Sequence, residues 1–496
     1  MKYDVVIIGS GLGGLQCGYI LSREGYNVCI LEKNHQLGGC LQTFTRNNSV
    51  FDTGMHYIGS MDEGQVLNNF FRYFRLTGNL KLKRMDEDRY DIVKFRGKEY
   101  NFAMGHERFV DTMLGYFPGE QEALKKYSVK LKEITDSVDL FNLRETSFHQ
   151  TGYLDFFSIG MDHFISDLTK NETLRNVLLG LSPLYAGVRE RSPLYLPMII
   201  HSSFINSAYR FIDGGAQVSD LLAEYITDNG GTIMRRAEVT DFIYHNGKIE
   251  AVKINGSEII EGETFISNIH PKALLNIAAD APFRPAYRNR INSIEETTGA
   301  FTLYLSMKKN SFEYINSNYY VFRTNEVWEA QNYDNNSWPS GYMIHFSPSS
   351  ENEKYTDAII VNTYMKWDDV AEWADTKVEK RGPSYREFKR MKAEKMFEAL
   401  ERDFPGIRSK TDAWYTSTPL TYRDYIGSPT GSFYGMMKDY RDPLRSMVMP
   451  RTSIPNLLLT GQNINVHGVV GVTICSVLTC SELTGTQYLI NKMRQA

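Results

Sequence analysis

Three glycines near the start of the chain, Gly9, Gly11 and Gly14, have the spacing G-x-G-x-x-G. A run of β-branched and apolar residues precedes them and predicts a strand, and the stretch after them has apolar positions typical of a helix. A second apolar run then ends in Glu32, at close to the spacing that dinucleotide-binding units use. Strand, glycines, helix, strand and acidic residue in this order predict a βαβ unit that binds a dinucleotide, and they disfavour a glycine-rich surface turn.

Each residue type in this unit has a physical role. Gly9 lets the strand turn sharply, Gly11 lets the backbone approach a pyrophosphate, and Gly14 lets the helix pack closely on the strand. The helix N-terminus offers free N–H groups and the positive end of the helix dipole to the phosphates. The carboxylate of Glu32 can accept hydrogen bonds from ribose hydroxyls. The residues expected at the cofactor in this unit are Gly9, Gly11, Leu12, Gly13, Gly14, Glu32 and Lys33.

A second glycine pair, Gly38-Gly39, follows shortly after Glu32. It allows backbone to pass close to a large bound cofactor, which NAD-binding Rossmann units do not need and which two-dinucleotide-binding-domain flavoproteins have. The sequence therefore predicts FAD, with Gly38, Gly39 and Cys40 beside it. The sequence contains no second G-x-G-x-x-G, so no tight NADPH site is predicted and the electron donor or acceptor is left unidentified.

The end of the chain repeats the same physical arrangement. A short strand at 456–459 leads to Gly461, and a loop with Gly468 and Gly471 leads into a predicted helix at 472–493. A helix N-terminus here would sit against the ribityl chain and flavin ring, where its dipole favours negative charge on the reduced flavin. A middle hairpin that begins at Val239 is expected to supply backbone contacts at the adenine end. These segments add Gly461, Gln462, Gly468, Val469, Gly471 and Val239 to the expected cofactor site.

The domain organisation follows from length and pattern. At 496 residues the chain is too long for one compact core, so two or three domains are expected. Apolar runs of similar spacing between 300 and 364 predict an antiparallel sheet of the kind that walls a substrate cavity. The predicted fold class is α/β, with a discontinuous Rossmann-like FAD-binding domain of the two-dinucleotide-binding-domain flavoprotein type (1–63, 206–299 and 411–496), an α-rich inserted region facing substrate or membrane (64–205) and a substrate domain of sheet and helix (300–410).

Composition excludes several classes of function. The formal net charge is −4, without the basic excess of a nucleic-acid-binding protein. The five cysteines form no C-x-x-C pair and suit a reducing compartment, and no metal site is predicted. The first strand begins too early for a signal peptide, and no apolar run is long enough to span a membrane. A cytoplasmic protein is expected, with the basic aromatic stretch 70–84 either on a membrane surface or solvated; the oligomeric state is not predicted.

Together these motifs resemble those of FAD-dependent oxidoreductases in the retinol saturase and phytoene desaturase (carotene isomerase) family. The stretch 51–57, which reads F-D-T-G-M-H-Y, and the ending T-G-Q…H-G…G at 460–471 are more specific than the nucleotide fingerprint. One departure is Gln462, where an aspartate commonly follows the glycine, so the group that holds the ribityl hydroxyls is left open. The other matching segments are 9–14 with Glu32, Gly38-Gly39-Cys40 with Thr43-Phe44, 58–59, Gly214-Gly215 and Pro419-Leu420-Thr421.

The resemblance implies that a hydride moves between flavin N5 and a carbon of a long apolar isoprenoid or polyene. It favours saturation, while desaturation and cis/trans isomerisation are alternatives that use the same parts. Two further classes stay open: a flavin amine oxidase or monooxygenase acting on a small polar substrate, and a catalytically silent flavin-binding protein. A cavity with charged residues would indicate the small polar substrate, and an apolar tunnel would indicate the isoprenoid.

Two histidines are candidate catalytic residues. His56 lies on a glycine-flanked loop just after the cofactor unit, where it could orient flavin or substrate or donate a proton. Its alternative role is to lock its own loop through hydrogen bonds. His467 begins the last predicted helix and could touch the flavin. Apolar residues in 183–187 and 193–200 could line a tunnel for a polyene, or they could belong to the core.

Overall fold

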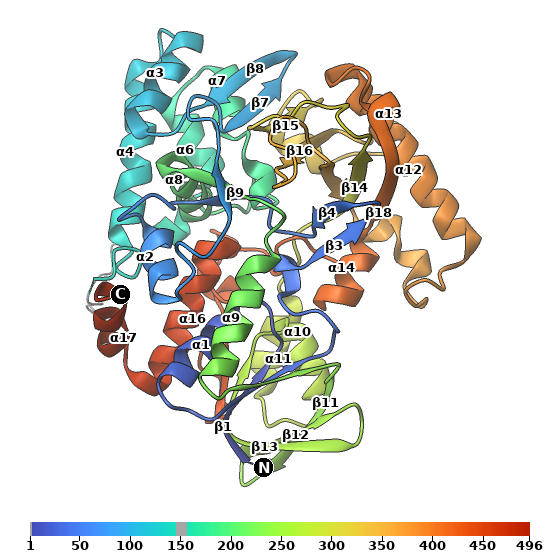
Figure 1. The fold of residues 1–496 in the computed structure, drawn as a ribbon. Helices are drawn as coiled ribbons and strands as arrows, with labels where there is room; N and C mark the ends of the chain where they lie inside the picture. Colours follow the sequence, from blue (N-terminus) through green and yellow to red (C-terminus); the bar gives the residue numbers. More distant parts are fainter. Residues whose placement is uncertain (1, 145–155) are drawn as a thin grey trace.

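The structure is a computed structural model that describes residues 2–144 and 156–496. Two seven-stranded sheets organise it, one in the lower part of Figure 1 and one at its upper right. A helical region lies beside the second sheet, at the upper left of the same view. The predicted α/β architecture is confirmed. Within the described residues, no helix is both long and apolar enough to cross a membrane.

The first sheet contains the strands of the predicted dinucleotide unit. Its strand order is β10 (Thr232–Arg235), β2 (Val28–Glu32), β1 (Lys2–Ile8), β13 (Glu258–Ser267), β12 (Lys248–Ile254) and β11 (Val239–His245), with β19 (Leu457–Leu459) paired to β13. The strands around β1 are parallel, whereas β12 runs antiparallel to both of its neighbours, β11 and β13. Strand β2 is buried along its whole length because parallel strands are covered on both faces.

Three helices cover this sheet near the predicted cofactor site. They are α1 (Leu12–Arg23), α9 (Ala216–Asp228) and α16 (Gly468–Thr484). Helix α1 packs against both of the others, so the N-terminal and C-terminal segments of the chain lie side by side (Figure 1). Strands β1 and β2 run parallel, and their carboxyl ends therefore meet at the N-terminus of α1.

The second sheet is mostly antiparallel, and two of its strands come from a distant part of the chain. Its order is β18 (Thr411–Ser417), β14 (Gly299–Met307), β17 (Ala358–Met365), β16 (Gly341–Ser347), β15 (Asn318–Phe322), β7 (Asp91–Phe95) and β8 (Lys98–Phe102). The β15–β7 pair is parallel. The region 64–205 was expected to be an α-rich insertion, but its hairpin β7–β8 completes one edge of the sheet of the region 300–410. At the other edge, β18 belongs to this sheet although residues from 411 onward were assigned to the FAD-binding domain.

The remaining elements connect these layers, and residues 145–155 of the region 64–205 lie outside the described part. The helices of that region are α2 (Val66–Tyr73), α3 (His106–Tyr116), α4 (Gln121–Ser137), α6 (Met161–Leu168), α7 (Glu172–Leu178) and α8 (Tyr195–Asn206). One small sheet, β5 (Ile58–Gly59) with β9 (Ala208–Phe211) and β6 (Leu82–Arg84), joins it to the rest. The other, β3 (Thr43–Arg46) with β4 (Ser49–Asp52), contacts β14 and β17 of the second large sheet through β4. The other helices are α10 (Pro271–Ile277), α11 (Pro285–Ser293), α12 (Gly382–Asp403), α13 (Ile407–Lys410), α14 (Pro419–Ile426), α15 (Pro443–Ser446) and α17 (Thr486–Arg494).

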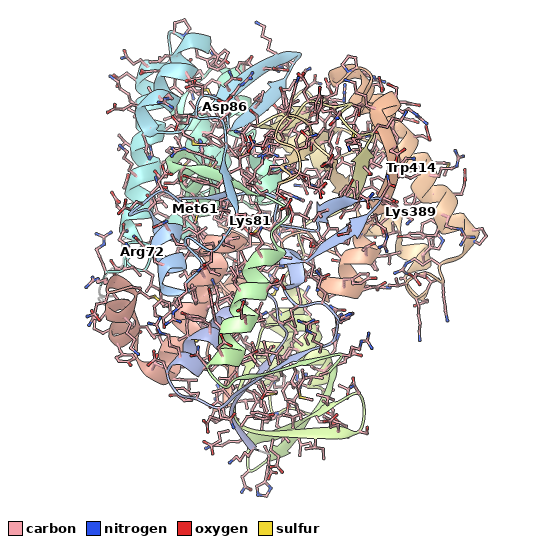
Figure 2. All side chains as sticks on the ribbon, viewed as in Figure 1. Met61, Arg72, Lys81, Asp86, Lys389 and Trp414 are labelled. Atoms are coloured by element: carbon pink, nitrogen blue, oxygen red, sulfur yellow. The ribbon has the colours of Figure 1, made fainter. Side chains whose placement is uncertain are left out.

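One expectation from the sequence needs correction, and one alternative is narrowed. The single helix predicted at 472–493 is two helices, because Gly485 has φ +90° and ends α16 before α17 begins. In the stretch 70–84, for which a membrane surface and solvent were both left open, Phe70, Phe71, Tyr73 and Phe74 are fully buried. Basic side chains of this stretch, such as Arg72 and Lys81, are the ones that reach the surface (Figure 2).

Candidate functional site

A cavity of about 420 Å³ collects segments from all parts of the chain. Glycine-rich and polar segments come from both ends of the sequence, and apolar side chains come mainly from the helical region. Gly14 does not line the cavity; a Cβ there would lie 2.1 Å from the Gly9 carbonyl oxygen, as close packing of helix on strand requires. The predicted site residues that do line it are Gly9, Gly11, Leu12, Gly13, Glu32, Lys33, Gly38, Gly39, Cys40, His56, Val239, Gly461, Gln462, His467, Gly468, Val469 and Gly471.

The two termini meet through the backbone of Gly13 and Gly461, with the side chain of Asn268 packed against both. A Cβ on Gly13 would lie 3.0 Å from the Cα of Gly461 and 2.6 Å from Asn268 Oδ1. Gly461 itself has φ +96°, which favours glycine. The side chain of Asn268 donates to the Gly9 carbonyl at 3.3 Å and so holds the glycine turn. Sequence analysis missed Asn268, although its position directly after β13, a strand adjacent to β1, was a usable signal.

Most of the hydrogen-bond acceptor capacity of the Glu32 carboxylate is used within the protein. Its Oε2 accepts from the backbone N–H of Ser10 at 3.0 Å and from the Ser10 hydroxyl at 2.7 Å. Its Oε1 accepts from the backbone N–H of Asn34 at 2.8 Å. A carboxylate can accept about four hydrogen bonds. Glu32 therefore retains acceptor capacity on Oε1 for a ligand hydroxyl.

The first turn of α1 carries unused donors. The N-cap, Gly11, has no side chain to cap the helix, and the first turn contains no acidic residue. The backbone N–H groups of Leu12, Gly13 and Gly14 have no hydrogen-bond partner in the described part of the chain. Unpaired N–H groups at a helix N-terminus form an anion site. The N-terminus of α16 likewise has no side-chain cap.

His56 is held as a neutral ring on the cavity wall. Its ring stacks on that of His345 with centroids 4.4 Å apart, and Asn362 Nδ2 donates to His56 Nε2 at 3.3 Å. Burial, helped by the nearby charge of Arg210, lowers the pKa of His56 to about 3. With Nε2 accepting, the ring proton is on Nδ1, which is buried and unpaired. A neutral ring at pH 7 does not favour the hypothesis that His56 is a proton donor; it favours an orienting role.

His467 is also neutral and has a structural partner. It is the N-cap residue of α16, and its Nε2 donates to the Leu184 carbonyl at 3.1 Å. Its ring packs against that of Tyr434 at a centroid distance of 4.4 Å. Burial lowers the pKa of His467 to about 4, although the hydrogen bond to Leu184 acts in the opposite direction. His467 thus ties the C-terminal loop to the helical region beside the cavity.

A buried polar network lies behind the wall that carries His56. Tyr57 donates to Asp91 Oδ2 at 2.9 Å and lies 2.6 Å from the hydroxyl of Tyr320. Asn318 donates to Asp91 Oδ1 at 2.8 Å and accepts from Arg210 at 2.9 Å. Burial raises the pKa of Asp91 to about 7, although the hydrogen bonds from Asn318 and Tyr57 and the Arg210 charge lower it. None of these partners was predicted from sequence, because they come from four separate elements.

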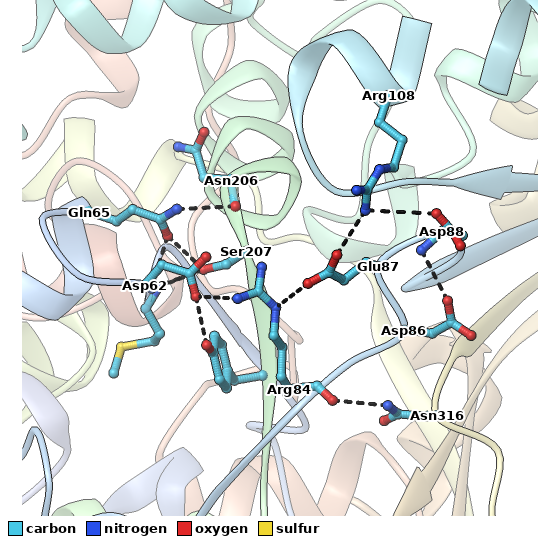
Figure 3. Close-up of polar contacts among 12 residues, drawn as sticks. Asp62, Gln65, Arg84, Asp86, Glu87, Asp88, Arg108, Asn206, Ser207 and Asn316 are labelled. Atoms are coloured by element: carbon cyan, nitrogen blue, oxygen red, sulfur yellow. Dashed lines mark hydrogen bonds and ion pairs between the residues drawn. The ribbon is translucent and has the colours of Figure 1, made fainter. Parts of the chain in front are cut away.

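The strand that follows the His56 loop is anchored by a second network (Figure 3). The hydroxyl of Ser207, at the end of α8, accepts from the backbone N–H groups of Met61 and Asp62 at 2.9 and 3.2 Å. It donates to Gln65 Oε1 at 2.6 Å. On the solvent side, Arg84 pairs with Asp62 at 2.9 Å. The loop that carries His56 is thereby fixed to β9 and the helical region.

Apolar side chains complete the lining. They include Leu184, Ile199 and Ile200 from the two segments that were expected to line a tunnel. Tyr185, Leu194 and Leu196 of those segments are core instead. Cys40 lines the cavity and is partly exposed, and desolvation raises the pKa of its thiol to about 11. No group of three or more His, Cys, Asp or Glu residues in the described chain could hold a metal ion.

Comparison with known proteins agrees with this geometry. Residues 7–74 match the family model described as an NAD(P)-binding Rossmann-like domain. An all-trans-retinol 13,14-reductase of Danio rerio is 23% identical over 97% of this chain and 85% of its own length. A chloroplastic prolycopene isomerase of an Oncidium hybrid cultivar is 22% identical over 96% of this chain and 83% of its own length. The expected resemblance to the retinol saturase and carotenoid desaturase family is confirmed.

The fold is shared more widely than the sequence. A solved structure of a putrescine oxidase variant, from a study of cofactor binding, superposes with a TM-score of 0.67 at 14% identity. It covers 98% of this chain and 99% of its own. At that identity the likeness establishes the fold alone, so the substrate has to be argued from the residues of the cavity.

Proposed function

We propose that this chain is an FAD-dependent oxidoreductase of carbon–carbon double bonds that acts on a long apolar isoprenoid or polyene, with saturation as the favoured direction. The observation that carries the proposal is one cavity lined both by the glycine segments of the two termini and by apolar side chains of the helical region. The activities in the names of the reductase and isomerase relatives support the same substrate class. Desaturation and isomerisation would use the same cavity.

The residues of the polar part of the cavity fit FAD. The unpaired N–H groups at the start of α1 suit a pyrophosphate, and Glu32 keeps acceptor capacity for a ribose hydroxyl. Gly13 and Gly461 line the cavity and present no side chain of their own to a ligand. When bound, the cofactor would supply hydride transfer between its N5 atom and a carbon of the substrate. The electron donor or acceptor that completes the cycle is not identified.

The chain's own contribution is positioning and exclusion of water. The uncapped N-terminus of α16 places the positive end of a helix dipole beside the cavity, where it favours negative charge. His56 and His467 are neutral and fixed by their partners, so they hold the cavity wall without adding charge to it. Leu184, Ile199 and Ile200 keep the adjoining surface apolar.

An oxidase of small amines is the second candidate, because the putrescine oxidase fold covers nearly the whole chain. Such an enzyme needs a polar or charged place for its substrate. The charged side chains on the cavity lining are those of Glu32, Lys33 and Glu238, all on segments that belong to the dinucleotide part. The wall around His56 and His345 is neutral, which favours the isoprenoid.

An anaerobic titration tests the proposal. The protein is reconstituted with FAD, reduced with dithionite, and mixed with all-trans-retinol or a carotenoid while both chromophores are followed. Flavin reoxidation with loss of polyene absorbance supports saturation, and a shift of polyene absorbance without flavin oxidation supports isomerisation. Desaturation is tested separately by adding a saturated precursor to the oxidised protein. Absence of a flavin spectrum after reconstitution contradicts the cofactor assignment, and bound flavin that responds to none of these lipids but is reduced by amines supports the second candidate.

A further inference from the structure

One side chain in the wall of the cavity presents an unused hydrogen-bond acceptor. His345 lies on β16, is 3% exposed and lines the cavity. Its ring stacks against His56 at 4.4 Å and lies 6.1 Å from the ring of Tyr57, which in turn stacks on Phe204 at 4.2 Å. Sequence analysis placed His345 in a strand of the substrate sheet but assigned it no role, although a histidine in an apolar strand was a signal.

Hydrogen-bond partners fix the tautomer of this histidine. A guanidinium can only donate, so the atom of Asn318 that lies 2.9 Å from Arg210 Nη2 is the carbonyl oxygen, Oδ1. His345 Nδ1 lies 2.9 Å from the same oxygen and therefore carries a proton and donates it. Burial, together with the nearby His56 and Arg210, holds the pKa of His345 well below its usual value. The ring is neutral, and Nε2 has a free lone pair.

Nothing in the described part of the chain uses this lone pair. His345 Nε2 has no hydrogen-bond partner there, and it is not among the polar atoms that the protein seals off completely, unlike Nδ1 of His56. Since the ring is otherwise enclosed and borders the cavity, Nε2 faces the space where a ligand would lie. A buried acceptor without a donor costs free energy, so the site favours a ligand that brings one.

We infer that His345 Nε2 accepts a hydrogen bond from a hydroxyl group of the substrate, so that the chain prefers isoprenoid alcohols to isoprenoid hydrocarbons. The inference rests on the proposed function and names the substrate class of the same cavity. Phe204, Ile199 and Leu67 offer only apolar contact to the rest of such a molecule. A hydrocarbon would displace water from Nε2 without replacing its hydrogen bond, and a site built for a hydroxyl discriminates strongly against an analogue that lacks it.

The test compares three substrates that share one polyene. The FAD-loaded, dithionite-reduced protein is given all-trans-retinol, its methyl ether, which has no donor, and the hydrocarbon in which hydrogen replaces the hydroxyl. Single-turnover rates against concentration give kcat/KM for each. We expect retinol to exceed both analogues by about 100-fold or more. The hydrocarbon controls for bulk, because it is smaller than retinol while the ether is larger.

Two variants assign the effect to His345. In H345F the preference for the alcohol should fall to less than about tenfold, whereas H345Q, whose amide oxygen can accept, should retain more of it. Equal rates for the alcohol and both analogues in the unaltered protein would overturn the inference while leaving the proposed function intact. A preference that H345F leaves unchanged would also overturn it, by assigning the hydroxyl to another group. No turnover of any polyene by a loaded, reducible flavin would instead refute the proposed function.

Discussion

The carboxylate of Asp52 should make this protein less stable as the pH rises from about 5 to 8. Asp52 ends β4 and is 7% exposed, and the structure gives it one hydrogen bond, from the backbone N–H of Gly215 at 2.7 Å. Burial raises its pKa to about 7, and the bond from Gly215 offsets part of that rise. In the unfolded chain an aspartate has a pKa of about 3.9. Between these values the folded state holds a proton that the unfolded state has lost.

The sign and size of the effect follow from linkage. Because the folded state binds more protons between about pH 4 and pH 7, the free energy of unfolding falls as pH rises through that window. Each pH unit costs about 1.4 kcal/mol, so about 3 kcal/mol is lost between pH 5 and pH 8. Unfolding entropy is about 2.1 cal/mol/K per residue, which for a chain of this length gives about 1 kcal/mol per degree. The expected shift in Tm from Asp52 alone is about 3 °C.

The substitution Asp52→Asn isolates this contribution. The amide oxygen can still accept from Gly215 and has no charge at any pH, so Tm of the variant minus Tm of the unaltered protein should increase by about 3 °C between pH 5 and pH 8. Scanning calorimetry or intrinsic fluorescence measures both proteins in matched buffers. Asp228→Asn, at an exposed position just inside the end of α9, is the control and should show no such trend. A difference that is constant with pH, or that shrinks toward pH 8, would refute the reasoning.

Three further outcomes are expected. Gly13→Ala should weaken FAD binding at least about tenfold in a fluorescence titration, because the added Cβ would meet Asn268 and Gly461 and push the start of α1 out of place, whereas Gly115→Ala in α3, with nothing within 4 Å, should not; equal affinities would refute this close packing at the cofactor site. Ser207→Ala should lower the free energy of unfolding by about 1–3 kcal/mol, since it leaves the buried N–H of Met61 without its acceptor while that of Asp62 keeps Gln65 Oε1, and Arg84→Ala by no more than about 1 kcal/mol; denaturant midpoints that rank the two the other way would contradict this. Cys40 should react slowly with iodoacetamide at pH 8 in the folded protein, because desolvation raises its pKa to about 11, and rapid labelling seen by mass spectrometry would contradict the raised pKa.

The spacing of residues in the sequence was sufficient to predict much of the cofactor site. The glycines around Gly11, the acidic residue Glu32 and the ending around Gly461 each form one continuous segment whose geometry depends on neighbours in sequence. The structure brings these segments, with His56 and His467, to one cavity. The spacing of these residues predicts their geometry because a turn, a strand end or a helix N-terminus forms within a few residues of the chain.

The parts of the fold that the sequence did not predict depend on contacts between distant parts of the chain. The hairpin β7–β8 reads as a local feature, but its pairing with β15 is set by which sheet edge is open in the folded molecule. From sequence, the stretch that contains Tyr73 could face a membrane or solvent, and only the packing of α2 against α16 and α17 shows that its aromatic rings are buried.

The chemistry of the wall is likewise a tertiary property. In the sequence, His345 is a single histidine in an apolar strand. In the fold, Arg210 from β9 and Asn318 from β15 fix its proton on Nδ1 and leave Nε2 free. Burial moves the pKa of Asp52 and Asp91 to about 7, and no pattern in the sequence records it. The sequence by itself determined the cofactor-binding unit, because backbone geometry there is local. Only the tertiary structure decided the protonation and orientation of the polar side chains around the cavity, because those depend on partners far away in the chain.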